Sequence, residues 1–231
     1  MTKPSKTPRR DRDRLRLLQA TLPHVSFDGW TLAAMRAGAG DVDMDPADLV
    51  RLFPDGPDEL IRLFMEHADT LMVHELERRD LGNMRIRDRI ATTVRVRLEQ
   101  QAPHREAIRR ALALQVLPQN GPGGLRALYR TVDLMWRAAG DTAADFNFYT
   151  KRLLLSGVYT ATLMFWINDE SDDFEATWAF LDRRIGNVME IEKAKARAKR
   201  WLPDPDDLVR RIVQRRRGGQ ASPFSASEKP G

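Results

Sequence analysis

The 231-residue sequence predicts an all-α protein. Apolar residues recur at helical spacing along nearly the whole chain, and residues that cap helices separate these stretches. No segment shows the strict alternation of apolar and polar residues that a half-buried strand requires. The apolar run at residues 153–167 is flanked by charged residues and is shorter than the ~20 residues that span a bilayer. We therefore expect helices throughout and few or no strands.

Three short helices are expected at the amino terminus, each ending at a proline or a glycine, because these residues interrupt a helix or favour its C-cap. Asp45 is well placed to cap the third of them by accepting a backbone hydrogen bond. The expected ranges are 11–21, ending before Pro23; 31–37, ending at Gly38 and Gly40; and 46–53, ending before Pro54.

Six longer helices are expected to follow. Pro57 suits the first turn of the fourth helix, whose apolar stripe runs from Leu60 to Leu76. The seventh helix is expected to bury Leu125 and Val132 for the same reason. The six ranges are 57–81, 84–100, 103–117, 123–139, 145–168 and about 171–199. The last range exceeds the average helix of about 11–12 residues, which suggests packing against a second subunit.

The charge distribution disfavours nucleic acid as a partner. The net charge is +5, but residues 41–59 hold seven acids and one base, Arg51. Because DNA affinity comes mostly from cations placed against phosphates, the third helix should be repelled by DNA. Arginines at positions 9, 10, 12, 14 and 16 keep the DNA-binding alternative open, since a basic arm can hold backbone phosphates.

The sequence offers little for catalysis. It has no cysteine, which excludes disulfides, thiol nucleophiles and zinc–thiolate sites. None of the four histidines belongs to a Glu-x-x-His pair, and there is no Gly-rich phosphate loop. No apolar segment follows the basic amino terminus, so we expect no secretory signal. The prediction is a cytoplasmic protein that is not an enzyme and has no metal or cofactor.

Four strings resemble the ninth coenzyme Q (ubiquinone) biosynthesis protein family. They are LFPDG at 52–56, DLMWRAAGD at 133–141, DFNFYTKRLLL at 145–155 and DFEATWAFL at 173–181. Phe148 departs from the Trp that the family often has there, so the ring is kept but the indole donor is lost. The three short amino-terminal helices also resemble the helix-turn-helix of TetR regulators.

This resemblance implies an all-α, TetR-like fold with a helix-turn-helix unit and a helical region for ligand binding and dimerisation. It implies a homodimeric, non-catalytic accessory protein of ubiquinone biosynthesis that presents an isoprenoid quinone precursor to the demethoxyubiquinone hydroxylase. The resemblance and the residue pattern together give four expected units: 9–54, helix-turn-helix; 57–202, lipid binding and dimerisation; 206–217, a membrane-surface helix; and 218–231, a disordered tail. The alternative is a TetR-type regulator with a small apolar effector.

Apolar residues of the fourth, seventh and eighth helices have two interpretations. Helical spacing alone favours a filled core, whereas the resemblance favours a cavity for an isoprenoid tail. Methionines add some weight to the cavity, because flexible thioethers suit an adaptable apolar pocket. The candidate lining residues are Phe64, Met72, Leu128, Trp136, Leu153, Tyr159 and Phe165.

Three surfaces are predicted around this region. Phe148 and Tyr149 point about 100° apart on a helix, so one ring should be exposed. A helix-start staple is the alternative interpretation of this pair. The predicted hydroxylase contacts are Met135, Phe148, Tyr149 and Arg152, and the predicted dimer contacts are Trp178, Leu181 and Ile185.

The helix at 206–217 combines an apolar side with basic residues, which is typical of a helix lying on anionic lipid. The alternative is a terminal helix that is exposed to solvent and contacts no membrane. The predicted membrane contacts are Leu208, Val209, Arg211, Ile212, Val213 and Arg216. The expected location is the inner face of the membrane, on the cytoplasmic side in a bacterium or in the mitochondrial matrix in a eukaryote.

Overall fold

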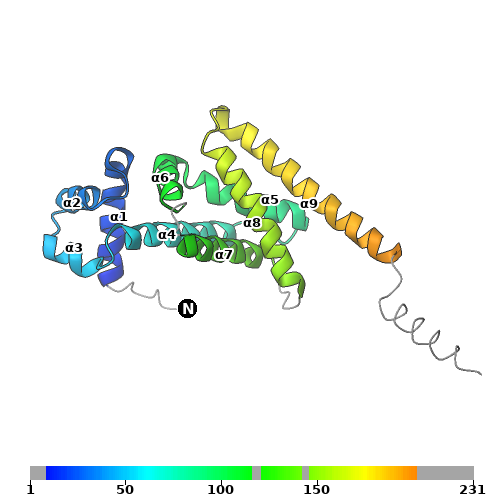
Figure 1. The fold of residues 1–231 in the computed structure, drawn as a ribbon, viewed down its shortest axis with the longest axis horizontal. Helices are drawn as coiled ribbons and strands as arrows, with labels where there is room; N and C mark the ends of the chain where they lie inside the picture. Colours follow the sequence, from blue (N-terminus) through cyan, green and yellow to red (C-terminus); the bar gives the residue numbers. More distant parts are fainter. Residues whose placement is uncertain (1–8, 116–120, 142–145, 202–231) are drawn as a thin grey trace, which may run out of the picture. The chain divides into compact units, whose positions relative to one another are not determined.

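A computed structural model describes residues 9–115, 121–141 and 146–201, and over these ranges the chain is helical without a β-strand. This confirms the all-α prediction. The elements are α1 (Arg9–Asp28), α2 (Leu32–Asp41), α3 (Pro46–Leu52), α4 (Pro57–Glu77), α5 (Ile86–Glu99), η1 (Ala102–His104), α6 (Arg105–Gln115), α7 (Gly121–Ala138), α8 (Phe146–Trp166), η2 (Asp172–Phe174) and α9 (Glu175–Trp201) (Figure 1). Two compact units comprise residues 1–185 and 186–231, and the packing below concerns the first.

The prediction that Pro23 ends the first helix is wrong. The helix α1 continues through Pro23 to Asp28. Proline removes one backbone hydrogen bond and crowds the preceding turn. The buried side chains of Leu22 and Val25 offset that loss, because burying each branched residue contributes about 1.5–3 kcal/mol.

The prediction that Gly38 ends the second helix is also wrong, because Gly38 lies inside α2. A Cβ atom at this position would come within 2.6–2.8 Å of the backbone and hydroxyl of Thr21 on α1. Glycine is therefore required for the close approach of the two helices, and not for a turn. Asp45 caps α3 as predicted, with its carboxylate 2.7 Å from the backbone N–H of Ala47.

The first three helices are attached to the rest of unit 1 by specific contacts. The indole of Trp30 donates a hydrogen bond to the carbonyl of Ala107 on α6, at 2.9 Å. Its ring also lies 5.4 Å from the ring of Phe64 on α4. An ion pair of 2.9 Å joins Arg14 on α1 to Glu59 on α4. These contacts hold α1 against both α4 and α6.

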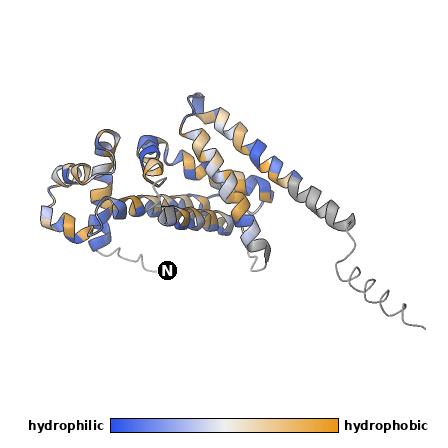
Figure 2. Cartoon of the chain, viewed as in Figure 1, coloured by the Kyte–Doolittle hydropathy of each residue, from blue (hydrophilic) through white to orange (hydrophobic). Residues whose placement is uncertain are grey.

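Helix α4 packs against α5 and α7, and α7 packs against α8. Along α4, hydrophobic residues recur among hydrophilic ones, as its amphipathic pattern predicts (Figure 2). Its apolar stripe buries Leu60, Phe64 and Met72, while Val132 and Met135 of α7 are fully buried. Leu125 departs from the prediction, because its side chain is 69% exposed near the start of α7.

A buried carboxylate connects the end of α8 to the start of α9. One oxygen of Asp169 accepts hydrogen bonds from the backbone N–H and the hydroxyl of Ser171, and the other accepts them from those of Thr177. Burial raises the pKa of Asp169, but the hydrogen bonds from Ser171 and Thr177 outweigh burial and lower the pKa from 3.8 to about 2. The ionised form therefore stabilises the fold.

Replacing Asp169 by Asn should destabilise the protein by about 2 kcal/mol at neutral pH, because about two pKa units are lost. A folded-state pKa below the ordinary value gives stability that is present above pH 4 and is lost as the pH falls toward about 2. The difference between Asp169→Asn and the wild type in urea unfolding should therefore shrink over that interval. The exposed neighbour Glu170→Gln is the control, and a difference that does not vary with pH would contradict the assignment.

Candidate functional site

An apolar pocket lies among α4, α5, α6, α7 and α8. Its volume is about 360 Å³, which is within the range of about 300–1,000 Å³ for small-molecule sites. Its lining residues are Met65, Arg97, Leu112, Gly124, Leu125, Ala127, Leu128, Thr131, Tyr159, Thr160 and Leu163. Since Leu125 is both a lining residue and largely exposed, the pocket opens near the start of α7.

One charged side chain, Arg97 of α5, stands in this otherwise uncharged lining. It is 3% exposed, and its Nε donates to the carboxylate of Asp69 on α4, at 3.2 Å. The same carboxylate oxygen accepts a hydrogen bond of 2.8 Å from the hydroxyl of Thr131 on α7. The pocket wall is therefore fixed by a buried ion pair that joins three helices.

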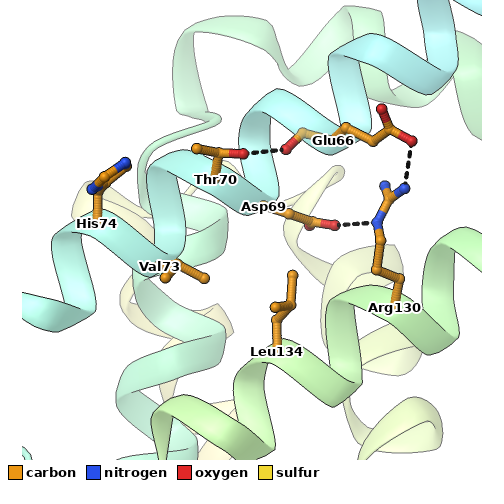
Figure 3. Close-up of a pocket in the computed structure, with 7 residues that line it drawn as sticks. All are labelled: Glu66, Asp69, Thr70, Val73, His74, Arg130 and Leu134. Carbon is orange, nitrogen blue, oxygen red and sulfur yellow. Dashed lines mark hydrogen bonds and ion pairs between the residues drawn. The ribbon is translucent and has the colours of Figure 1, made fainter. Parts of the chain in front are cut away.

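The other oxygen of Asp69 faces a second, polar pocket of about 400 Å³ (Figure 3). There it accepts a hydrogen bond of 3.1 Å from Arg130 of α7, whose guanidinium also pairs with Glu66 at 2.7 Å. Figure 3 shows Arg130 reaching from α7 toward Asp69 and Glu66 on α4. The Asp69 carboxylate thus separates a polar pocket from an apolar one.

Tyr159 of α8 lines the apolar pocket and is 6% exposed. Burial raises the pKa of its hydroxyl, while the positive charge of Arg97 lowers it and the negative charge of Asp69 raises it further. The net direction is upward, so the hydroxyl remains protonated at neutral pH. Tyr159 therefore offers a hydrogen-bond donor beside the Arg97 guanidinium.

Of the seven residues predicted to line a cavity, Leu128 and Tyr159 line this pocket. Phe64 and Met72 are buried in α4, where Phe64 packs against Trp30 and His104. The remaining three lie outside the lining, on other surfaces of α7 and α8. Trp136 donates to the carbonyl of Lys151, Leu153 is 74% exposed, and Phe165 stacks on Phe180 at 4.7 Å.

Arg97, Asp69 and Thr131 were missed from the sequence, although a signal was present for the first two. Asp69 follows Ala68 and precedes Met72 in the apolar stripe of α4, and Arg97 lies between Val94 and Leu98 in that of α5. An ionisable residue at a core position of a helical pattern needs a buried partner. Two such residues on neighbouring helices predict an ion pair.

The segments that carry the family resemblance form a second buried network. Arg152 of α8 is 2% exposed and pairs with Asp133 at 2.7 Å and with Asp141 at 3.2 Å. Lys151 pairs with Asp141 at 2.7 Å, and its ammonium lies 5.5 Å from the centre of the Trp136 ring. These contacts join the end of α7 to the first turns of α8, so the motif positions α8.

Two of the four predicted hydroxylase contacts do not lie on the surface. Met135 is fully buried and Arg152 is buried in the ion-pair network, contrary to the expectation that they contact a partner. Tyr149 is 67% exposed, and Leu153 lies one turn further along α8 and is more exposed still. The side chain of Phe148 lies outside the described residues.

The structure describes the residues predicted to form dimer contacts but not those predicted to contact the membrane. Leu181 and Ile185 are buried within a single chain, contrary to the expectation of an intersubunit contact. Trp178 donates to the carbonyl of Asp173 and lies 4.9 Å from the guanidinium of Arg95. The six predicted membrane contacts, at positions 208 to 216, lie outside the described residues.

In the portion that the structure describes, no group of three or more His, Asp or Glu side chains could hold a metal ion. Burial lowers the pKa of His67 and of His104. None of the described helices is long and apolar enough to cross a membrane.

Replacing Arg152 by Met should destabilise the protein by about 3–5 kcal/mol, because Asp133 and Asp141 would lose their buried partner. Arg137→Met is the matched control. Arg137 also pairs with Asp133, at 2.7 Å, but its side chain is 69% exposed, so its loss should cost less than about 1 kcal/mol. Urea unfolding measures both variants, and equal losses would contradict a scaffolding role for Arg152.

Comparisons with known proteins identify related sequences. The COQ9 family model matches residues 121–192, which include α7, α8 and the Arg152 network. The ubiquinone biosynthesis protein COQ9, mitochondrial, of Rattus norvegicus is 37% identical over 183 residues, covering 76% of this chain and 58% of that protein. The Homo sapiens protein of the same name is 35% identical over 183 residues, covering 76% and 57%. The chain spans less than two thirds of the length of these relatives.

A solved structure supports the fold. The TetR transcriptional regulator from Nitrosomonas europaea ATCC 19718 matches with a TM-score of 0.63 and 22% identity, covering 76% of this chain and 97% of that one. This likeness confirms the TetR-like fold. The chain therefore contains a COQ9 domain and is homologous over three quarters of its length to the COQ9 proteins, as its sequence motifs indicated.

Proposed function

We propose that this protein is a lipid-binding accessory protein of ubiquinone biosynthesis that holds an isoprenoid quinone precursor. The apolar pocket with a buried arginine in its wall carries this proposal. The names of its relatives support a role in ubiquinone biosynthesis. Nothing in the pocket resembles a catalytic set of residues, so the proposed work is binding and not chemical conversion.

The physical properties of the pocket suit such a ligand. Each methylene removed from water contributes about 0.8 kcal/mol, so a short length of tail is enough to drive capture. A long isoprenoid exceeds a volume of about 360 Å³, so the remainder of its tail would leave through the opening near Leu125. Tyr129, one turn from Leu125, adds a second exposed apolar side chain there.

Transfer to the demethoxyubiquinone hydroxylase is the second part of the proposal. Tyr149 and Leu153, which we call the α8 patch, are exposed and lie on the same helix as Arg152, whose ion pairs fix α8. Exposed aromatic and aliphatic side chains on a rigid helix are typical interface anchors. The hydroxylase would dock on this patch while the pocket holds the precursor.

Assembly and location complete the proposal. The protein would act as a homodimer at a membrane surface, through the basic and apolar residues at 206–217. Met164 and Phe165 of α8 are exposed and are better dimer candidates than the buried Leu181 and Ile185. The relatives are named as mitochondrial proteins, and the corresponding site here is the matrix or the cytoplasmic face of a bacterial membrane.

The alternative, a DNA-binding regulator, is favoured by the TetR-like fold alone. Helix α3 has one base, Arg51, and its guanidinium is paired with Asp48 at 2.8 Å. This pairing reduces the charge available for phosphate, so DNA remains the second candidate.

Filling the pocket should abolish lipid binding. Ala127→Trp places a bulky ring in the apolar pocket, whereas Val73→Trp places the same ring in the polar pocket on the other side of Asp69. Native mass spectrometry and solvent extraction should detect lipid with the wild type and Val73→Trp but not with Ala127→Trp. Equal lipid content in all three, or a wild type that takes up no added quinone, would contradict the proposal.

The α8 patch should be required for docking. Tyr149→Lys is expected to weaken co-purification with the hydroxylase at least about tenfold, as loss of an interface anchor does. Phe27→Lys, which alters an exposed aromatic side chain on α1, is the control. The docking assignment fails if Tyr149→Lys retains the hydroxylase as well as the control does.

A further inference from the structure

We propose that Arg97 and Tyr159 recognise the oxygen atoms of a neutral head group, so that the pocket selects a quinone or an alkoxyphenol over an anionic lipid. This inference rests on the proposed function and adds to it the chemistry of the head group and the residues that read it. The two side chains come from α5 and α8 and line the same apolar pocket.

The pocket holds hydrogen-bond donors that the protein does not use. The Nε of Arg97 donates to Asp69, and its Nη2 lies 4.0 Å from the sulfur of Met65. Within the described ranges, neither Nη1 of Arg97 nor the hydroxyl of Tyr159 forms a hydrogen bond. A guanidinium is always charged and has five N–H donors, so Arg97 retains donors for a ligand.

Both side chains are more than nine-tenths buried, so these donors have limited access to bulk water. Both side chains line the pocket, so a ligand oxygen placed there would accept hydrogen bonds from donors that the protein leaves unused. Thr131 does not compete for this role, because its hydroxyl proton is directed to Asp69 or to the carbonyl of Ala127. The arrangement therefore favours a ligand that accepts hydrogen bonds.

The charge of the surrounding groups selects a neutral acceptor. The positive charges of Arg97 and Arg130 are matched by the negative charges of Asp69 and Glu66, which form ion pairs with them. The other lining residues of the apolar pocket are uncharged. A carboxylate or phosphate head group would add an unbalanced charge in a buried site.

A carbonyl or phenol oxygen avoids this cost and still accepts hydrogen bonds from an arginine and a tyrosine. The raised pKa of Tyr159 keeps its hydroxyl in the donating form. Quinones and alkoxyphenols with an apolar tail combine such oxygens with a large hydrophobic surface. The apolar part of the pocket would hold the tail beside Leu128 and Leu163.

Three probes with alkyl tails of similar length test this inference on the full chain: decylbenzoquinone, decylbenzene and decanoate. Their dissociation constants are measured by displacement of a fluorescent apolar dye. The wild type should bind decylbenzoquinone at least about tenfold more tightly than decylbenzene, as one or two net hydrogen bonds provide. Decanoate should bind more weakly than decylbenzoquinone.

Tyr159→Phe should weaken decylbenzoquinone binding about fivefold and leave decylbenzene binding unchanged, since only the hydroxyl is removed. Its melting temperature should not fall, because that hydroxyl forms no hydrogen bond in the described part of the protein. Thr92→Val, which removes a hydroxyl of α5 that lies outside the pocket lining, is the control. The pair Arg97→Gln with Asp69→Asn removes one charge of each sign and should weaken quinone binding further.

The possible results separate the two proposals. Equal affinity for decylbenzoquinone and decylbenzene in both the wild type and Tyr159→Phe would overturn head-group recognition and leave the lipid pocket standing. Tighter binding of decanoate than of decylbenzoquinone would overturn the choice of a neutral head group. Failure of all three probes to bind would overturn the lipid-binding function itself, and head-group recognition with it.

Discussion

A carboxylate removed from water has to be surrounded by donors, and Asp69 imposes this constraint on the middle of the protein. Its two oxygens are satisfied by Arg97, Thr131 and Arg130, which come from α5 and α7. Leaving a buried charge unpaired costs about 3–5 kcal/mol, so the three helices cannot separate without that penalty. The wall between the apolar and polar pockets therefore follows from one ion-pair cluster.

The helices could largely be predicted from the sequence, because amphipathic spacing and caps are local signals. Asp45 caps α3 and Pro57 begins α4 as expected. The errors occur where tertiary packing overrides a local rule. Pro23 lies within α1 because its neighbours are buried, and Gly38 lies within α2 because Thr21 leaves no room for a side chain.

The site was less predictable, because it depends on which faces of different helices meet. Tyr159 and Leu128 could be named from apolar spacing, but Leu153 has the same character and is largely exposed. Arg97 has no apolar signal, and it enters the pocket only because Asp69 lies opposite on α4. The apolar patterns of α4 and α5 mark Asp69 and Arg97 as ionisable residues at core positions, but they do not show that Arg97 lines a pocket.

The two buried networks have distinct roles in organising the surface. The cluster around Arg152 places α8 relative to α7, and the cluster around Asp69 joins α7 to α4 and α5. Asp133 and Asp141 lie in the motif strings, and their ion pairs with Arg152 support this arrangement. The exposed residues Tyr149 and Leu153 depend on that support for their position.

The attachment of Trp30 to α6 has a further consequence. The carbonyl that accepts its indole hydrogen bond belongs to Ala107, and the same short helix carries Leu112 in the wall of the apolar pocket. A guest that pushed Leu112 outward would tilt α6 and strain the bond at Trp30. The apolar pocket and the amino-terminal helices are thus connected through α6 and one hydrogen bond at Trp30.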